Sequence, residues 1–224
     1  MSPQNLKLQR ALEKLLPSRR PLKVLEAGCG STSHLPLDAS WHLSGIDLSQ
    51  RQLDQNLHLQ EKILGNLETH EWDLARFDLI VCWDVIEHLP NPNKALLNML
   101  SAVAPGGILV LAFPHLHSIK GYVTKLTPFW VHIAFYRFLL NHSRSIAEDH
   151  QFPTYLRRDI LPKRIIDFSK SNGMECCYHV NYEGPVQYEL RQRNKLANTF
   201  FSLTARLGLN DSDCMIILRR PMPE

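Results

Sequence analysis

The 224-residue sequence lacks the features that mark several classes of protein. No uninterrupted apolar run reaches the ~18 residues that a membrane-spanning helix needs. Its five cysteines include no Cys-x-x-Cys pair and no zinc spacing, which argues against a redox dithiol, a zinc module or a disulfide framework. A formal net charge of +3 is too small to indicate nucleic-acid binding. The first residues show no basic head followed by an apolar core, so we expect no secretory signal and a cytoplasmic protein.

What the sequence does contain is the composition of an ordinary globular protein. Apolar residues make up 44% of it, enough to build a sizeable core. The length suits one domain, and neither an internal repeat nor a low-complexity linker divides the chain. We therefore expect a single domain over residues 1–224.

Short apolar runs alternate with helical patterns along the chain. Expected strands cover 22–26, 41–47, 62–67, 77–84, 108–113, 175–182 and 214–219. Expected helices cover 5–16, 49–60 (with Leu53 and Leu57 inward), 91–103 (with Asn91 as its cap), 162–171 and 187–207. Such alternation is typical of a parallel sheet with helices on both faces. The sequence therefore predicts an α/β fold with a Rossmann-like, seven-stranded, mostly parallel sheet.

The first strand leads into a turn with two glycines, Val-Leu-Glu-Ala-Gly-Cys-Gly over residues 24–30. Gly28 and Gly30 allow positive φ and close approach of a ligand to the backbone. Glu26, at the carboxyl end of the strand, suits a ligand with an ammonium or hydroxyl group and repels a phosphate. Ser31–Ser33 follow, so the third glycine of a dinucleotide site is absent, which disfavours a nicotinamide-dependent oxidoreductase.

Polar residues also end three further expected strands. They are Asp47, Asn66 and Asp84. Ligands of open α/β sheets bind where the carboxyl ends of the strands meet, so these side chains are expected to converge with Glu26. Asp47 can accept hydrogen bonds from both hydroxyls of a ribose, and Asn66 can contact an adenine edge. Asp84 and Glu26 can bind an ammonium group.

Four motifs in combination resemble the class I S-adenosylmethionine-dependent methyltransferases, especially the small-molecule branch with the ubiquinone- and menaquinone-pathway enzymes. They are Val24-Leu-Glu-Ala-Gly-Cys-Gly30, Gly45-Ile-Asp-Leu-Ser49, Asp84-Val-Ile-Glu-His-Leu89 and Pro105-Gly-Gly-Ile-Leu-Val-Leu111. The resemblance covers about residues 20–113 and implies S-adenosylmethionine as the cofactor.

The resemblance also assigns roles to individual residues. Gly28, Cys29 and Gly30 would line the methionine and ribose portion of the cofactor, and Asp47 would hold the ribose hydroxyls. Leu48 would flank the adenine, and the adenine edge would meet Asn66 and Leu67. The family more often has Asp where Asn66 stands, a change that removes a charge but keeps a hydrogen bond.

Methyl transfer from a sulfonium needs alignment, desolvation and, for an alcohol or phenol, a base. His88 follows the fourth expected strand and can act near neutral pH. The alternative is that His88 only braces the loop. We expect a small or medium-sized acceptor, methylated on oxygen rather than nitrogen, such as a specialised-metabolite or envelope-glycan precursor.

Residues 114–155 contain no strand-like run but many histidines and aromatics, which predicts a helical, lid-like insertion after the fifth strand. Its position beside the expected cofactor makes it a candidate acceptor pocket. The candidate substrate-binding residues are His115, Tyr122, Trp130 and Tyr136. Alternatively, the insertion only packs on the sheet, or 129–140 makes peripheral contact with a membrane.

Two other functions stay open. Asp84-x-x-Glu87-His88 with His115 or His117 resembles the metal site of magnesium-using O-methyltransferases, although we expect no metal because the string is common in metal-free relatives. The second of these functions is that of a protein that binds S-adenosylmethionine but catalyses no reaction. No nucleic-acid partner is expected, and no interface signal for an oligomer stands out.

Overall fold

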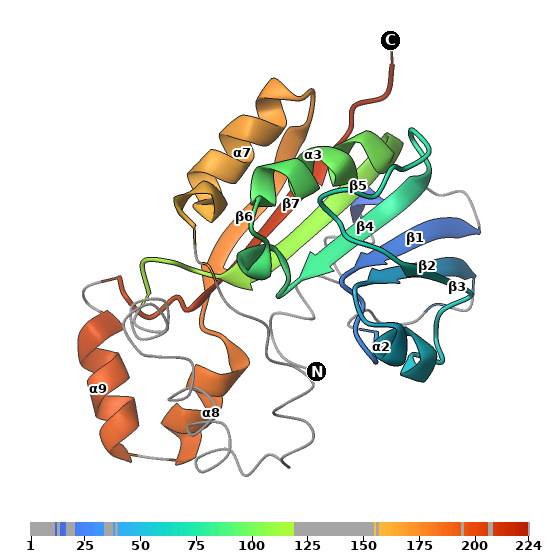
Figure 1. The fold of residues 1–224 in the computed structure, drawn as a ribbon. Coiled ribbons are helices and arrows are strands. Elements are labelled where there is room, and N and C mark those ends of the chain that lie inside the picture. The colour runs from blue at the N-terminus through green and yellow to red at the C-terminus, as the bar shows by residue number, and fades with distance from the viewer. Residues whose placement is uncertain are drawn as a thin grey trace.

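The computed structural model describes residues 12, 14–16, 21–33, 38, 40–118, 155, 157–193, 195–205 and 208–223. Seven strands form one sheet in the order β3-β2-β1-β4-β5-β7-β6 (Figure 1). They are β1 (Leu22–Ala27), β2 (Trp41–Asp47), β3 (Glu61–Leu64), β4 (Phe77–Trp83), β5 (Val103–Pro114), β6 (Glu175–Tyr182) and β7 (Asp213–Arg219). Only β7 runs antiparallel to its neighbours, β5 and β6. The predicted Rossmann-like, mostly parallel sheet is confirmed.

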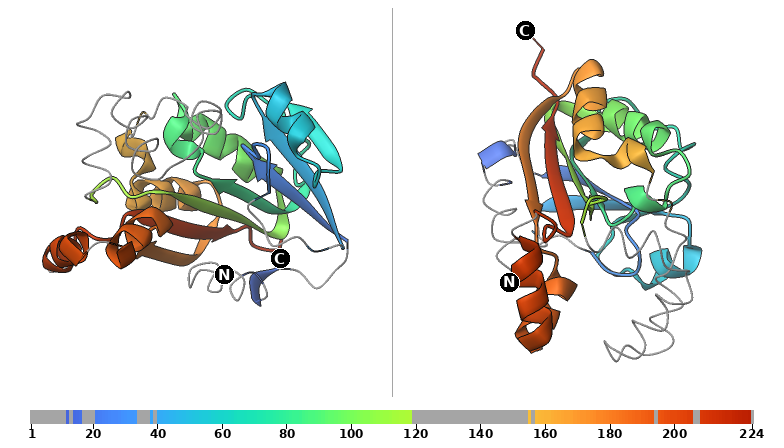
Figure 2. Two further views of the ribbon diagram at one scale, coloured as in Figure 1. Left: turned by 90° about the horizontal axis from the view of Figure 1, so that it is seen from below. Right: turned by 90° about the vertical axis from the view of Figure 1, so that its left-hand side faces the viewer.

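Helices lie on both faces and around one end of the sheet, as predicted (Figures 1 and 2). One face is covered by α3 (Pro92–Ala102) and α7 (Pro162–Ser171), while α2 (Gln50–Gln55) follows β2 and packs Leu53 into the cluster on the opposite face. Two short 3-10 helices, η1 (Ile86–His88) and η2 (Arg158–Ile160), precede α3 and α7. The pair α8 (Pro185–Arg193) and α9 (Lys195–Ala205) projects beyond the end of β6.

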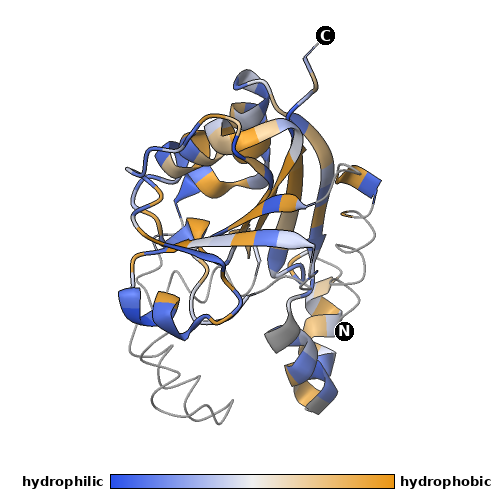
Figure 3. Ribbon diagram, turned by 90° about the vertical axis from the view of Figure 1, so that its right-hand side faces the viewer, coloured by the Kyte–Doolittle hydropathy of each residue, from blue (hydrophilic) through white to orange (hydrophobic). Residues whose placement is uncertain are grey.

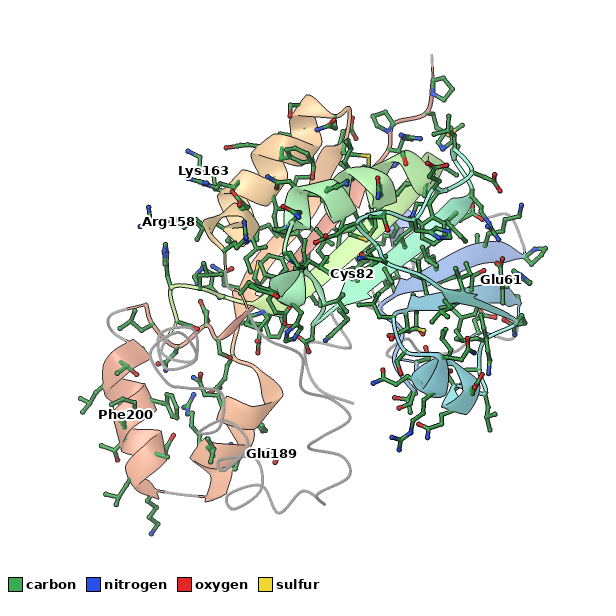
Figure 4. All side chains as sticks on the ribbon, in the orientation of Figure 1. Glu61, Cys82, Arg158, Lys163, Glu189 and Phe200 are labelled. Carbon is green, nitrogen blue, oxygen red and sulfur yellow. The ribbon has the colours of Figure 1, made fainter. Side chains whose placement is uncertain are left out.

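The central strands form because their apolar runs are buried on both faces. All residues of β4 except Trp83 are buried, and Cys82 lies in the middle of the sheet (Figure 4). One core cluster joins the sheet to α3 and α7, and a second, which includes Leu12, fills the opposite face. Hydrophobic residues accordingly follow the strands, whereas α2 is mainly hydrophilic (Figure 3). Near-continuous apolar strands are typical of parallel sheets covered on both sides.

The predicted long helix over 187–207 is wrong, because α8 and α9 stand in its place. Leu196, Phe200 and Leu203 lie on one side of the helix at helical spacing, and all three are more than half exposed. The reason is that α9 contacts α8 rather than a face of the sheet, and Figure 4 shows Phe200 on this projecting pair.

Two predicted boundaries also fail near β3. The helix begins at its expected cap, since Ser49 accepts from the N–H of Gln52, but it ends at Gln55 instead of 60. Leu57 is therefore 86% exposed rather than inward. β3 ends at Leu64, because Asn66 starts a turn by accepting the N–H of Glu68 at 2.8 Å.

Asn91 is only partly the predicted cap of α3. It occupies the N-cap position without a side-chain cap bond, and its own N–H donates to Glu68 Oε1 at 2.6 Å. Pro92 at the first helical position supplies a start signal instead, since proline has no N–H to satisfy there.

Several predictions lie outside the described residues. These are most of the helix over 5–16, most of the insertion over 114–155, the membrane-contact segment 129–140 and the residues Tyr122, Trp130 and Tyr136. Within the described ranges, no helix is long and apolar enough to cross a membrane.

Candidate active site

A cavity of about 570 Å³ opens where the carboxyl ends of β1, β2 and β4 meet. Five predicted cofactor-contacting residues other than the glycines line it, namely Asp47, Leu48, Asn66, Leu67 and Asp84. Gly28, Gly30 and the candidate base His88 line it as well. The structure thus brings together residues from four separate loops, as the strand-end argument predicted.

The glycine turn forms the floor of the cavity and requires glycine. Gly28 has a φ of +74° and Gly30 a φ of +55°, in the left-handed region that residues with a Cβ rarely adopt. A Cβ at Gly28 would lie 2.4 Å from Cγ2 of Val85. The N–H of Gly28 donates to the carbonyl of Ile46 at 2.8 Å, so the turn is tied to β2.

Asp47 ties the glycine turn to the start of α2. Its Oδ2 accepts from the N–H of Gly30 at 3.0 Å, and its Oδ1 accepts from the N–H of Ser49 at 2.9 Å. The side chain is largely buried yet lines the cavity. Each carboxylate oxygen can accept a further hydrogen bond, so Asp47 can bind a pair of hydroxyls while holding both loops.

Asn66 presents its amide to the cavity in a fixed orientation. Because Oδ1 already accepts the N–H of Glu68, the Nδ2 group is the part that can donate to a ligand. Leu67 is buried beside it, and Leu48, 60% exposed, lines the cavity from the end of β2. An amide donor flanked by apolar walls suits the edge and faces of a purine base.

Asp84 and His88 line the cavity from the segment that follows β4, whose Val85 lies against Gly28 of the glycine turn. Asp84 follows β4 with a φ of +52°, an uncommon conformation for a residue other than glycine. Such strain persists where the surroundings fix it, often at a functional site. His88 ends η1, and its Nε2 lies 3.8 Å from Oε1 of Glu87, which is 3% exposed.

Three predicted site residues do not line the cavity. Glu26 is buried and accepts a hydrogen bond from Ser33 Oγ at 2.7 Å. Cys29 is buried too, and burial, followed by the nearby Asp47 and Glu26 charges, raises the pKa of its thiol to about 12. His115 follows β5 one strand further along the sheet.

Other lining residues were not predicted. Gln52 lines the cavity from the buried side of α2, and Trp83 ends β4. Tyr155 lines the opening, where its N–H donates to the carbonyl of Glu87 at 3.0 Å. Gln52 could have been found from its place one turn after the Ser49 cap, whereas no local pattern marks Tyr155.

The described residues give no support to the metal alternative. Among them, no three His, Cys, Asp or Glu side chains are grouped so that they could hold a metal ion.

Comparison with known proteins now decides the family. A family model described as a methyltransferase domain matches residues 4–161, more than half of the chain. The chain belongs to this methyltransferase family. The match confirms the predicted S-adenosylmethionine-dependent methyltransferase class at the level of the family.

Individual relatives are similar over part of this methyltransferase or in fold alone. A ubiquinone biosynthesis O-methyltransferase of Coxiella burnetii is 29% identical over 126 residues, which are 49% of this chain and 54% of that protein. The chain thus spans about half the length of the curated relatives it matches. An S-adenosylmethionine-dependent methyltransferase from Mesorhizobium loti superposes with a TM-score of 0.57 at 14% identity, covering 94% of this chain and 96% of that one.

The same fold also occurs in a protein named for another reaction. The [4+2]-cyclase SpnF superposes with a TM-score of 0.60 at 14% identity, covering 97% of this chain and 81% of that one. The fold alone does not fix the reaction, so the function has to be argued from the site.

Proposed function

We propose that this methyltransferase transfers the methyl group of S-adenosylmethionine to a hydroxyl oxygen of a small-molecule acceptor. The observation that carries the proposal is the single cavity that Gly28, Asp47 and Asn66 share with Asp84 and His88. Asp47 and Asn66 offer hydrogen-bonding groups for a nucleoside, and His88 offers a base. The partial likeness to ubiquinone biosynthesis O-methyltransferases favours oxygen over nitrogen.

The residues present fit the cofactor. A Cβ at Gly30 would meet only Gln52 Oε1, at 3.4 Å, so the methionine portion can approach the backbone there, and the Asp47 carboxylate suits the two ribose hydroxyls. The Asn66 amide suits the adenine edge, and Asp84 suits the ammonium group. When bound, the cofactor supplies an electrophilic methyl group on a sulfonium.

In this proposal His88 accepts the proton of the acceptor hydroxyl. Its side chain is about a quarter exposed and lines the cavity beside Leu89 and Pro90. The neighbouring Glu87 carboxylate can stabilise the imidazolium that forms. Trp83 and Tyr155 line the same cavity, and in this proposal they limit access of water to the reacting atoms.

The test measures S-adenosylhomocysteine formation with a panel of phenolic and alcoholic acceptors, and cofactor affinity separately by calorimetry. His88→Gln should lower kcat by roughly 10²–10⁴-fold, the usual contribution of a general base, without changing cofactor affinity. His58→Gln, at an exposed histidine outside the cavity, is the matched control. An unaltered rate in His88→Gln would make His88 a bracing residue. Cofactor binding without turnover of any acceptor would instead favour a silent binding protein.

A further inference from the structure

The lining of the cavity differs in chemistry from one stretch of the chain to another. Residues 83–90 and Tyr155 contribute Asp84, His88 and a set of apolar or aromatic residues, namely Trp83, Val85, Leu89, Pro90 and Tyr155 itself. The earlier stretches contribute hydroxyl, carboxylate and amide groups, on Ser31, Thr32, Asp47, Gln52 and Asn66. The stretch that carries the proposed base therefore offers mainly apolar contact area to a ligand, whereas the earlier stretches offer hydrogen-bonding groups.

Backbone hydrogen bonds place Tyr155 beside His88. The N–H of Tyr155 donates to the carbonyl of Glu87 at 3.0 Å, and His88 is the next residue after that carbonyl. The N–H of His88 in turn donates to the carbonyl of Val85 at 2.9 Å, which closes the turn of η1. Because Tyr155 and His88 also line the same cavity, a ligand group held near His88 is within reach of Tyr155.

The side chain of Tyr155 is not engaged by the fold around it. The residue is 49% exposed, and among the described residues neither its ring nor its hydroxyl makes a hydrogen bond or a ring contact. Tyrosine combines a large apolar ring with a polar tip and is enriched where proteins bind other molecules. The backbone bond to Glu87 thus holds at the cavity a large aromatic side chain that the described fold does not use.

Trp83 gives the same stretch a second aromatic ring. It is the last residue of β4, it is partly buried against the second core cluster, and it lines the cavity directly before Asp84. Two aromatic rings in contact are more stable than their buried area alone accounts for. A planar aromatic ligand therefore gains more from Trp83 and Tyr155 than a saturated ligand of the same size.

The lining and the base together favour a phenol over a sugar. A sugar carries several hydroxyl groups, and burying them beside Val85, Leu89 and Pro90 would leave them without partners, which costs free energy. A phenol carries one polar group on an apolar ring. The phenol of tyrosine has an ordinary pKa of about 10, whereas that of water is about 15.7 and an aliphatic alcohol is a comparably weak acid. A histidine base acting near neutral pH is therefore better matched to a phenol.

We infer that Tyr155 binds the acceptor and that the acceptor is a phenol, whose ring packs against Tyr155 and Trp83 while its hydroxyl faces His88. This inference rests on the proposed function, which supplies the methyl acceptor and the role of His88. It adds a binding residue from the second half of the chain. It also selects phenols over the glycan precursors that the sequence left open.

The test titrates the full chain, saturated with S-adenosylhomocysteine, with 2-naphthol and with decahydro-2-naphthol, which has the same carbon skeleton and hydroxyl group but no aromatic ring. The chain is labelled with ¹⁵N at tryptophan, and the Trp83 indole signal is identified with Trp83→Phe. 2-Naphthol should shift this signal and bind about threefold to tenfold more tightly than the saturated alcohol, the usual gain of an aromatic pair. Equal affinity for the two alcohols, or no shift of the Trp83 signal, would overturn the inference.

Variants of Tyr155 separate acceptor binding from a structural role. Tyr155→Ala removes the ring and should weaken 2-naphthol binding about fivefold or more, whereas Tyr155→Phe keeps the ring and should stay within about twofold of wild type. Tyr188→Ala is the matched control, because Tyr188 on α8 is 51% exposed and outside the cavity lining. All three should keep the wild-type Tm, since the N–H that bonds to Glu87 belongs to the backbone. Unchanged 2-naphthol affinity in Tyr155→Ala, with or without a lower Tm, would refute a binding role for Tyr155.

The affinity for S-adenosylhomocysteine, measured by calorimetry on the same samples, tells this inference from the proposed function. It should be the same in the wild type and in all three tyrosine variants. Absence of S-adenosylhomocysteine binding by the wild type would overturn the proposed function and this inference together. Normal binding of S-adenosylhomocysteine, with equal affinity for the two alcohols, would overturn this inference alone.

Discussion

Replacing Asp47 with alanine should separate the ribose role from ordinary fold stability. In the proposed complex the carboxylate accepts from both ribose hydroxyls, and hydrogen bonds to a charged group contribute about 1.5–3 kcal/mol each. Losing two of them costs about 3 kcal/mol or more, roughly 100-fold or more in the dissociation constant of S-adenosylhomocysteine. Asp47→Asn keeps one acceptor oxygen and should show an intermediate loss, about tenfold.

The same substitution removes the acceptors of the Gly30 and Ser49 N–H groups. Both groups lie near the open cavity, where water can replace part of each bond, so we expect about 1–2 kcal/mol of lost stability. In a domain of this size that lowers Tm by about 2–8 °C. The affinity loss should therefore be the larger effect, and the protein should remain folded at 25 °C.

Calorimetry with S-adenosylhomocysteine measures the affinity, and circular dichroism on the same samples measures Tm. Asp54→Ala is the matched control, because Asp54 is an exposed residue of α2 outside the cavity lining, and its carboxylate accepts a hydrogen bond from Gln50 Nε2 at 2.8 Å. Affinity within twofold of wild type in Asp47→Ala, with Tm lowered as calculated, would refute the ribose role and leave Asp47 as a fold residue.

Two further predictions test the glycine turn and the titration of His115. Gly28→Ala should lower Tm by several degrees and abolish cofactor binding, since its Cβ would meet Val85 and its φ is +74°. The double variant Gly28→Ala with Val85→Ala should recover part of the stability. If it recovers none, the positive φ of residue 28, and not the contact with Val85, accounts for the loss. For His115, a folded-state pKa below 6.5 means that the unfolded chain binds more protons, so this residue's contribution to stability falls as pH drops through 6.5. Thermal scans from about pH 7.5 to about 5.5 should accordingly show a smaller loss of Tm in His115→Gln than in wild type.

The sheet was predictable because its strands obey local rules. The run Phe77–Trp83 is apolar except for Asp78, and the β2 run ends at an acid followed by a helix cap at Ser49. The two glycines have the positive φ that their sequence context predicted. Each of these features depends on residues close together in the sequence, so the sequence is sufficient to predict it.

The wrong or missing predictions concern residues whose positions depend on contacts with residues far away in the sequence. The spacing of Leu196, Phe200 and Leu203 is that of an amphipathic helix, but nothing in it says whether α9 meets the sheet or only α8. Tyr155 reaches the cavity through one backbone bond to Glu87, a contact across 68 positions that no periodicity encodes. Residues placed by tertiary contacts therefore have to be read from the structure.

The position of each acid relative to its strand end explains which ones reach the cavity. Asp47 is the last residue of β2, and Asp84 is the first residue after β4. Both residues therefore lie at the edge of the sheet, and both line the cavity. Glu26 is followed by Ala27 within β1, so its side chain still points from a face of the sheet and is covered by Ser33. A shift of one residue separates a side chain that can meet a ligand from one that can only support the turn. Strand-end chemistry should thus be assigned by the register of the last paired residue, and not by proximity in sequence to the glycines.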